Sequence, residues 1–177
     1  MGCDLFKEKE RQMMDIKINE EARTALLKEV QEVSDHYLNL QPADGGWSIK
    51  QILEHLYLME HSVVDIIKKE LTSGEDKEAK QRKIELTVDR TVKVDAPDYL
   101  VPSDDVAALK EMTEKLEQSH FALQQLAEAY DEEVFAKKAL DHPAFGKMNL
   151  AQWILFVGYH EMRHTKQIQE VKASLHL

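Results

Sequence analysis

The stretch from Asn149 to Leu175 most constrains what this chain can fold into, because it has the pattern of one long amphipathic helix. Its apolar residues recur at three- and four-residue steps, so they share one face of a helix. Asn149 stands just before them and is a good N-cap. Such a helix must bury its apolar side against other elements. The apolar positions are Leu150, Trp153, Ile154, Val157, Ile168, Val171 and Leu175.

The middle of this helix carries a polar turn on its apolar side. At about 100° per residue, Glu161 and His164 fall inside the apolar stripe and His160 lies at its edge. Imidazoles and a carboxylate are costly to bury unless they are paired or bound to a metal. The two histidines are four residues apart, so both rings leave the helix on the same side and can chelate one ion.

Three more segments have amphipathic helical patterns, and a breaker cluster ends the first of them. Strand signals are weak, apart from an alternation between Ile84 and Val94 that favours a short extended piece. The prediction is an all-α fold: a four-helix bundle with a long connection, residues 75–103, between the second and third helices. The expected ranges are 20–40, 49–71 and 104–130, after N-caps at Asn19, Ser48 and either Ser103 or Asp104.

Length, charge and cysteine content bound the class of protein. The 177 residues predict one domain, 1–177, with residues 1–18 as an N-terminal arm or short helix. A net charge of -10 argues against a nucleic-acid partner, because such a surface needs clustered Lys and Arg. The single cysteine, Cys3, excludes an internal disulfide and fits a reducing compartment. With no membrane-spanning run and no visible secretory signal, the predicted location is cytoplasmic, away from membranes.

A third histidine, His55, lies at the edge of the apolar face of the 49–71 helix. Side chains from facing helices of a bundle converge on shared core layers, so His55 can meet His160 and His164. Three neutral imidazoles with an open fourth position suit Zn²⁺, or a related divalent ion such as Ni²⁺. The alternative is three separate histidines, each satisfied by its own hydrogen bonds.

Residues 160–164 also spell H-E-x-x-H, the signature of zinc proteases in which Glu161 is the general base. The usual third ligand has no candidate at the right spacing before Leu177, and no clear edge strand is predicted to hold a peptide. A metalloprotease is therefore the weaker alternative. Glu161 stays the candidate catalytic residue, as a proton acceptor or an orienter of a ligand near the metal.

Two motifs resemble the DinB/YfiT-like superfamily. Residues 45–56, GGWSIKQILEHL, are similar to its Gly-Trp-Ser/Thr…His-Leu signature, and residues 142–168 are similar to its closing segment. The resemblance spans about residues 19–172. It implies a four-helix bundle, often a homodimer, with a three-histidine metal site. Matched position by position, the ligands are His55, His160 and His164.

The resemblance fixes the metal site better than the reaction. Characterised relatives include thiol-dependent transferases and isomerases that use bacillithiol, mycothiol or glutathione, and many others are named metal-dependent hydrolases by inference. It therefore implies a thiol-dependent S-transferase or a hydrolase that acts on a small electrophilic substrate, with a divalent metal and a low-molecular-weight thiol as co-substrate. The alternative is a non-catalytic metal-binding module of a stress response.

Other residues of chemical interest have simpler interpretations. His120 is expected to be a satisfied core histidine, and His142 to have a structural role in the connector before the last helix. Arg163 is expected in solvent or at a subunit contact. Trp47 and Trp153 are expected to anchor the core.

Overall fold

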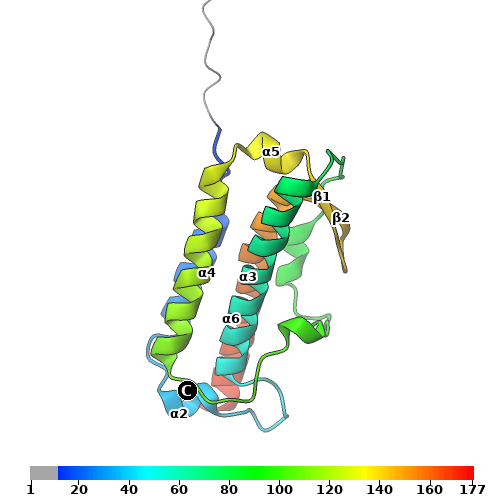
Figure 1. Cartoon of the computed structure of the whole chain (residues 1–177). Helices are drawn as coiled ribbons and strands as arrows, with labels where there is room; N and C mark the ends of the chain where they lie inside the picture. Colours follow the sequence, from blue (N-terminus) through cyan, green and yellow to red (C-terminus); the bar gives the residue numbers. More distant parts are fainter. Residues whose placement is uncertain (1–11) are drawn as a thin grey trace, which may run out of the picture.

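A computed structural model describes residues 12–177 of the chain. Four long helices in this range run side by side as a bundle, which confirms the predicted architecture (Figure 1). The expected N-terminal arm falls mostly outside the described residues, and its last two positions already belong to the first helix. The long helices are α1 (Lys17–Val30), α3 (Ile49–Ser73), α4 (Leu109–Ala129) and α6 (Leu150–Ser174).

Shorter elements connect the long helices in the described range. The extended piece expected around Ile84 is wrong, since residues 84–88 form a 3₁₀ helix. A two-stranded antiparallel hairpin before α6 was not predicted, because strands of four residues are too short for alternation to show; Gly146, with φ of +68°, supports its turn. These elements are α2 (Asp35–Asn39), η1 (Ile84–Val88), η2 (Asp98–Leu100), α5 (Glu132–Ala136), β1 (Ala139–His142) and β2 (Gly146–Asn149).

The helix predicted from residue 20 to 40 is broken into α1 and α2. After Val30 the chain leaves the helix, and Ser34 adopts an extended conformation before α2 begins. The break shifts the buried face, so that Leu38 is fully buried while Tyr37, four residues after the buried Val33, is exposed. A helical stripe read across a break therefore assigns the wrong residues beyond it.

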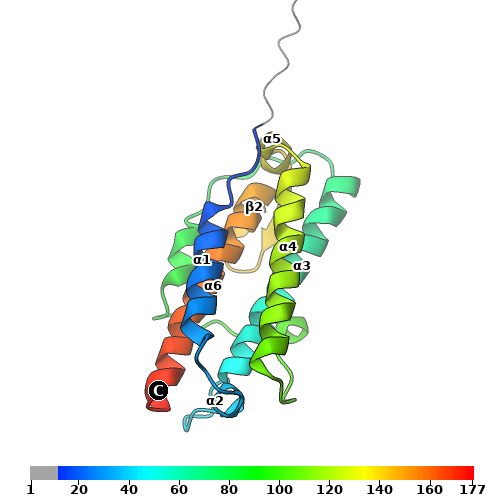
Figure 2. The ribbon, with the colours of Figure 1, turned by 90° about the vertical axis from the view of Figure 1, so that its left-hand side faces the viewer.

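Asn19 is not the N-cap of α1, which begins two residues earlier at Lys17. Asn19 lies within the helix, is buried, and donates from its side-chain amide to the carbonyl of Ile154 on α6 at 2.8 Å. The two helices approach closely here, since a Cβ atom on Gly158 would lie 3.1 Å from backbone atoms of Asn19. Figure 2 shows α1 beside α6. The side chain of Asn19 therefore makes a tertiary contact with α6 and does not cap α1.

The third long helix begins later than the expected cap at Ser103 or Asp104. Its first residue is Leu109, and Val106 before it is 81% exposed. Ser103 is held instead by α3: its backbone N–H donates to Glu54 at 2.9 Å, and its carbonyl accepts from Lys50 at 3.0 Å. The connection therefore follows an irregular path across the N-terminal turns of α3 before α4 starts.

The predicted caps of the two longest helices are confirmed. Ser48 accepts from the backbone N–H of Gln51 and receives the reciprocal bond of a capping box. Asn149 accepts from the backbone N–H of Gln152 at 2.8 Å. Both helices have 25 residues, yet neither they nor any other helix within residues 12–177 is long and apolar enough to cross a membrane.

The apolar core is divided into two clusters, one towards each end of the bundle. One cluster includes residues 49–56 of α3 and 168–171 of α6. The other includes residues 59–67 of α3 and 150–157 of α6. Buried polar side chains of all four long helices lie between the clusters, and we call this region the polar layer. Its members are Arg23, His55, Glu60, Ser119, His120, Glu161 and His164, with the half-buried His160.

Candidate metal centre

His55, His160 and His164 converge in the polar layer, and we call them the imidazole cluster. The Nε2 atom of His160 lies 3.4 Å from Nε2 of His55 and 3.2 Å from Nε2 of His164. One candidate ligand atom from each ring can be chosen so that all three lie within 4.8 Å of one another. Helices α3 and α6 pack side by side, so residues more than 100 positions apart meet as the sequence predicted (Figure 1).

Two of the three rings have their outer nitrogen engaged. Nδ1 of His55 is 2.8 Å from the carbonyl oxygen of Leu100 in η2, and Nδ1 of His164 is 2.8 Å from Oε1 of Gln167. A carbonyl or amide oxygen can only accept, so each Nδ1 carries the proton and donates it. Each Nε2 is therefore left with a lone pair that points into the cluster. Outer partners of this kind orient metal-binding imidazoles in proteins.

The inner contacts of the cluster cannot all be satisfied by hydrogen bonds within it. With neutral rings, His160 can donate one Nε2 proton to a single neighbour, which leaves the lone pair on Nε2 of the other neighbour without a proton to accept. Nδ1 of His160 is also buried without a hydrogen-bond partner in the described structure. A shared cation relieves the lone-pair contacts, and nitrogens bound tetrahedrally to one Zn²⁺ lie about 3.3 Å apart. The donor set fits a divalent metal.

Burial keeps these rings uncharged. It lowers the pKa of His164 to about 3, with a further contribution from the nearby His55, and lowers the pKa of His160 well below its ordinary value. The pKa of His55 is lowered for the same reason, although its bond to Leu100 offsets part of the effect. Neutral imidazoles are the form that binds metals, so the cluster is ready to bind one at neutral pH.

Aromatic side chains flank the imidazole cluster. The rings of Trp47 and His55 are 5.0 Å apart between centroids, and those of Phe156 and His160 are 5.5 Å apart. The ring of His142 meets that of Phe156 edge to face, with centroids 4.6 Å apart, and its Nδ1 accepts from the backbone N–H of Ala144, which agrees with its expected structural role. Burial lowers the pKa of His142 to about 4. The cluster thus has a largely apolar rim.

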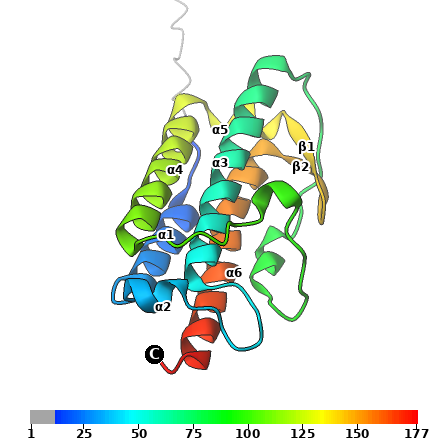
Figure 3. The ribbon, with the colours of Figure 1, turned by 60° about the horizontal axis from the view of Figure 1, so that its bottom comes forward.

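The long connection is fastened beside the cluster. Arg163 of α6, which was expected in solvent or at a subunit contact, is partly exposed and donates to the carbonyl oxygens of Thr87, Asp89 and Val92. Arg90 forms a two-pronged ion pair with Glu170 and also reaches Oε1 of Gln167 at 3.3 Å. Figure 3 shows η1 lying along α6. Part of the connection thus covers the helix that supplies two imidazoles.

Glu161, the candidate catalytic residue, is held by an arginine. Both of its carboxylate oxygens accept from Arg23 of α1, at 2.8 and 3.0 Å, and it is 2% exposed. Arg23 also donates to Glu60 of α3 at 2.8 Å, and Glu60 accepts from Ser119 and lies 3.1 Å from Nδ1 of His120. We call these five residues the Arg23 network. A catalytic role for Glu161 stays a prediction.

Opposing effects set the charge of the network. Burial raises the pKa of Glu161, and the charge of Arg23 offsets part of this shift. Burial also acts against ionisation of Glu60, yet its bond to His120 and the charge of Arg23 hold the pKa of Glu60 below its ordinary value. The two carboxylates keep the pKa of Arg23 above its ordinary value despite burial. The expectation that His120 is a satisfied core histidine is confirmed.

Sequence reasoning missed Arg23 and Glu60. Arg23 follows Asn19 by four residues and precedes Leu26 by three, so a charged residue stands on the buried stripe of α1. That is the same signal that singled out the polar turn of the last helix. It indicates that a buried charge has a partner, but the partners lie 37 and 138 positions away, and no pattern in the sequence links either of them to Arg23.

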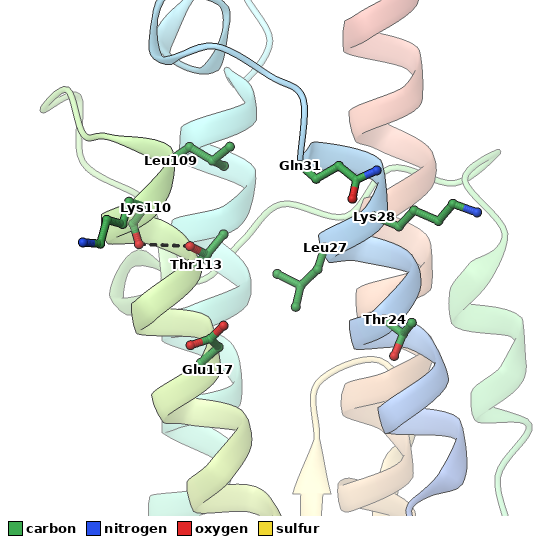
Figure 4. A pocket seen from close by; sticks show the side chains of 8 residues that line it. All are labelled: Thr24, Leu27, Lys28, Gln31, Leu109, Lys110, Thr113 and Glu117. Atoms are coloured by element: carbon green, nitrogen blue, oxygen red, sulfur yellow. Dashed lines mark hydrogen bonds between the residues drawn. The ribbon is translucent and has the colours of Figure 1, made fainter.

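A separate groove of about 670 Å³ lies between α1 and α4, as Figure 4 shows. None of the residues that line it belongs to the imidazole cluster. A second groove, of about 410 Å³, lies near the start of α3 and is likewise lined by other residues. The first groove is lined by Thr24, Leu27, Lys28, Gln31, Leu109, Lys110, Thr113 and Glu117.

Comparison with known proteins agrees with the fold. A family model described as the DinB superfamily matches residues 18–168. The chain is 32% identical over 155 residues to a Bacillus subtilis (strain 168) protein named "Uncharacterized protein YuaE", covering 88% of this chain and 95% of the relative. It is also similar in fold to TT2238, described as a four-helix bundle protein, with a TM-score of 0.60 at 21% identity over 88% of this chain and 95% of that one.

Proposed function

The chain belongs to the DinB superfamily, and from this premise we propose that it is a metal-dependent enzyme whose divalent ion is held by His55, His160 and His164. The observation that supports this most is the convergence of Nε2 atoms at 3.2 and 3.4 Å while two of the rings donate outwards from Nδ1. Zn²⁺ suits three imidazoles best, and Ni²⁺ is the second candidate.

The proposed reaction is thiol-dependent S-transfer, or hydrolysis, on a small electrophilic substrate. A divalent ion on three neutral imidazoles supplies a Lewis acid with room for a further ligand, and so lowers the pKa of a thiol or water that binds there. The residues of this chain hold the ligand nitrogens unprotonated by burial and orient two rings through Leu100 and Gln167. Trp47 and Phe156 flank the rings with apolar surface that limits access of water.

A metal-binding module without turnover is the second candidate. Neither of the two grooves is lined by the imidazole cluster, so neither supplies a substrate site beside the proposed ion. The zinc-protease alternative is supported less, because Arg23 occupies both oxygens of the carboxylate that such a mechanism needs as a base. Homodimer formation and a cytoplasmic location remain predictions.

Metal analysis of purified protein tests the first half of the proposal. We expect about one divalent ion per chain in the wild type and none in His164→Ala, at equal helix content by circular dichroism. Equal metal content in the two proteins would overturn the metal site.

A thiol-transfer assay tests the second half. The metal-loaded protein is mixed with a chromogenic electrophile and, in separate reactions, bacillithiol, mycothiol, glutathione or no thiol. Turnover that needs both the metal and one thiol supports the transferase, and turnover with metal alone supports the hydrolase. Full metal loading with no turnover in any reaction favours the non-catalytic module.

A further inference from the structure

The Arg23 network joins the two helices that carry the imidazole cluster. Arg23 on α1 donates from Nη2 to Glu60 of α3 at 2.8 Å, and from Nε and Nη2 to the two oxygens of Glu161 of α6. Its Nη1 atom donates to the carbonyl oxygen of Leu116 on α4. One buried side chain, 5% exposed, therefore binds each of the other three long helices.

Both carboxylates of the network stand close to a ligand histidine along their own helix. Glu161 directly follows His160 and precedes His164 by three residues, and Glu60 follows His55 by five. Five residues span about 7.5 Å of helix, little more than one turn. A rotation or shift of α6 that moved Glu161 would therefore move both of its imidazoles as well.

The chemistry of the guanidinium group fixes direction as well as distance. It is planar, and its donors form a rigid fork that matches the two oxygens of a carboxylate. The two-pronged bond to Glu161 therefore restrains the rotation of α6 about its axis, while the bond to Glu60 restrains α3 relative to α6. A lysine ammonium would supply the same charge without that fork.

Stability alone is a weak reason for such a network in this core. The desolvation of buried ions offsets much of their mutual attraction, and well-packed apolar replacements are often neutral or stabilising. Apolar side chains fill the core on both sides of the polar layer. What apolar packing does not supply is a directional link between α3 and α6 next to the ligands.

Building on the proposed metal function, we propose that Arg23 is a positioning residue for the metal centre. Through Glu60 and Glu161 it sets the spacing and axial rotation of α3 and α6, so that the Nε2 atoms of the imidazole cluster meet. Arg23 touches neither metal nor substrate in this role. Glu161 acts with it as the attachment point on α6.

Metal affinity and cobalt spectroscopy test this role with two variants. Arg23→Lys keeps the buried charge but loses the fork, and the triple variant Arg23→Met, Glu60→Gln, Glu161→Gln removes all three charges at similar side-chain size. We expect the Zn²⁺ dissociation constant to rise about 10- to 100-fold in both, as for other partners that orient metal ligands. We also expect the visible absorption spectrum of the Co²⁺-loaded protein to change, because the ligand geometry changes.

A core truncation serves as the matched control. Leu126→Ala, on α4, which carries no cluster histidine, removes buried side-chain volume at a residue that is 3% exposed. It should weaken folding yet keep the wild-type Zn²⁺ affinity and Co²⁺ spectrum. Wild-type affinity and spectrum in Arg23→Lys and the triple variant would overturn the positioning role.

The same measurements separate this inference from the function on which it rests. A wild-type chain that binds no Zn²⁺ overturns the proposed function and the positioning role together. Normal binding by the wild type and by both variants overturns the positioning role alone. If the triple variant does not fold, Arg23→Lys decides the question, because it leaves the buried charges balanced as in the wild type.

Discussion

The polar layer has two halves, the Arg23 network and the imidazole cluster, and they differ in how their buried polar groups find partners. In the Arg23 network every charged group meets an opposite charge: Arg23 binds both carboxylates, and Glu60 also accepts from Ser119. In the imidazole cluster Nε2 of His55 and Nε2 of His164 both turn lone pairs towards Nε2 of His160, which can donate to only one of them, and Nδ1 of His160 is buried without a partner. The charges of the network are satisfied within the chain, whereas a cation shared by the three Nε2 atoms would be needed to satisfy the inward lone pairs of the imidazole cluster.

This difference suggests different roles for the two groups: the Arg23 network is structural, and the imidazole cluster is a binding site. Buried polar groups usually find partners, so a group that lacks one in a well-packed interior points to something the protein binds. The imidazole cluster meets that description and the Arg23 network does not. Four predictions test the contrast, in order of decreasing expected effect.

Arg23→Ala should produce the largest loss of stability, because it leaves two carboxylates buried without their cation. Removal of one partner of a buried ion pair costs about 3–5 kcal/mol. Urea unfolding of metal-free protein measures the change. Lys17→Ala, which removes an exposed ion pair on the same helix, should change the free energy of unfolding by less than about 1 kcal/mol. Equal effects of the two substitutions would contradict the contrast drawn here.

Zinc should stabilise the wild type and leave variants of the imidazole cluster unchanged. At a free concentration one hundred times the dissociation constant, a ligand of the folded state adds about 2.7 kcal/mol to the free energy of unfolding. His55→Ala and His164→Ala should show no such gain. Thermal unfolding with Zn²⁺ and with a chelator provides the measurement. An equal gain in these variants would place the ion elsewhere.

Gly158→Ala should destabilise the Arg23 network, because that network depends on the close approach of α1 to α6. The new Cβ atom would lie 3.1 Å from backbone atoms of Asn19 and from the carbonyl of Ile18, which cannot move without moving the helix. Overpacking of this kind costs about 1–3 kcal/mol. Denaturant unfolding should show that loss, whereas Lys166→Ala at an exposed position of α6 should change stability by no more than about 0.5 kcal/mol.

His142 provides a histidine outside both halves, and its effect should be the smallest. Its folded pKa of about 4 lies below the unfolded value of about 6.5, so the unfolded chain binds a proton first as the pH falls. Its neutral form thus stabilises the fold above pH 6.5, and that contribution is lost between pH 6.5 and 4. His142→Asn keeps an acceptor for the N–H groups that Nδ1 binds and does not titrate.

Because His142 is only partly shielded from solvent, we expect the acid-induced loss between these pH values to shrink by about 1 kcal/mol in His142→Asn. Urea unfolding at pH 7, 5.5 and 4 measures this difference. His61→Asn, which replaces an exposed histidine of α3, is the control for the loss of any one histidine. The same slope in all three proteins would show that His142 takes no part in the acid response.

Local chemistry determined what the sequence could predict. The caps at Ser48 and Asn149 and the spacing of His160 and His164 follow from bonds within a turn or two, and the helix pattern placed His55 on the facing helix. The start of α4 did not follow, because Ser103 binds α3 instead of capping a helix. To predict such a helix start, one must know the tertiary partner of the capping residue as well as the sequence pattern.

The same reasoning explains the other errors. Asn19 was taken for a cap because its type favours one, yet it donates to a carbonyl 135 positions away. The break after Val30 has no Gly or Pro to announce it. For Glu161 the stripe gave the direction towards the core but not its partner there, Arg23, while its role near the metal stays a prediction.

The outer bonds of His55 and His164 differ in how easily mutation can remove them. His55 donates to a main-chain oxygen at Leu100, which every amino acid possesses, so substitutions at that position leave the acceptor in place while the chain keeps its path. His164 donates to the side chain of Gln167, which a single codon change can abolish. The orientation of the His55 ring therefore tolerates substitution of its partner residue. The orientation of the His164 ring can be altered by a single substitution at Gln167.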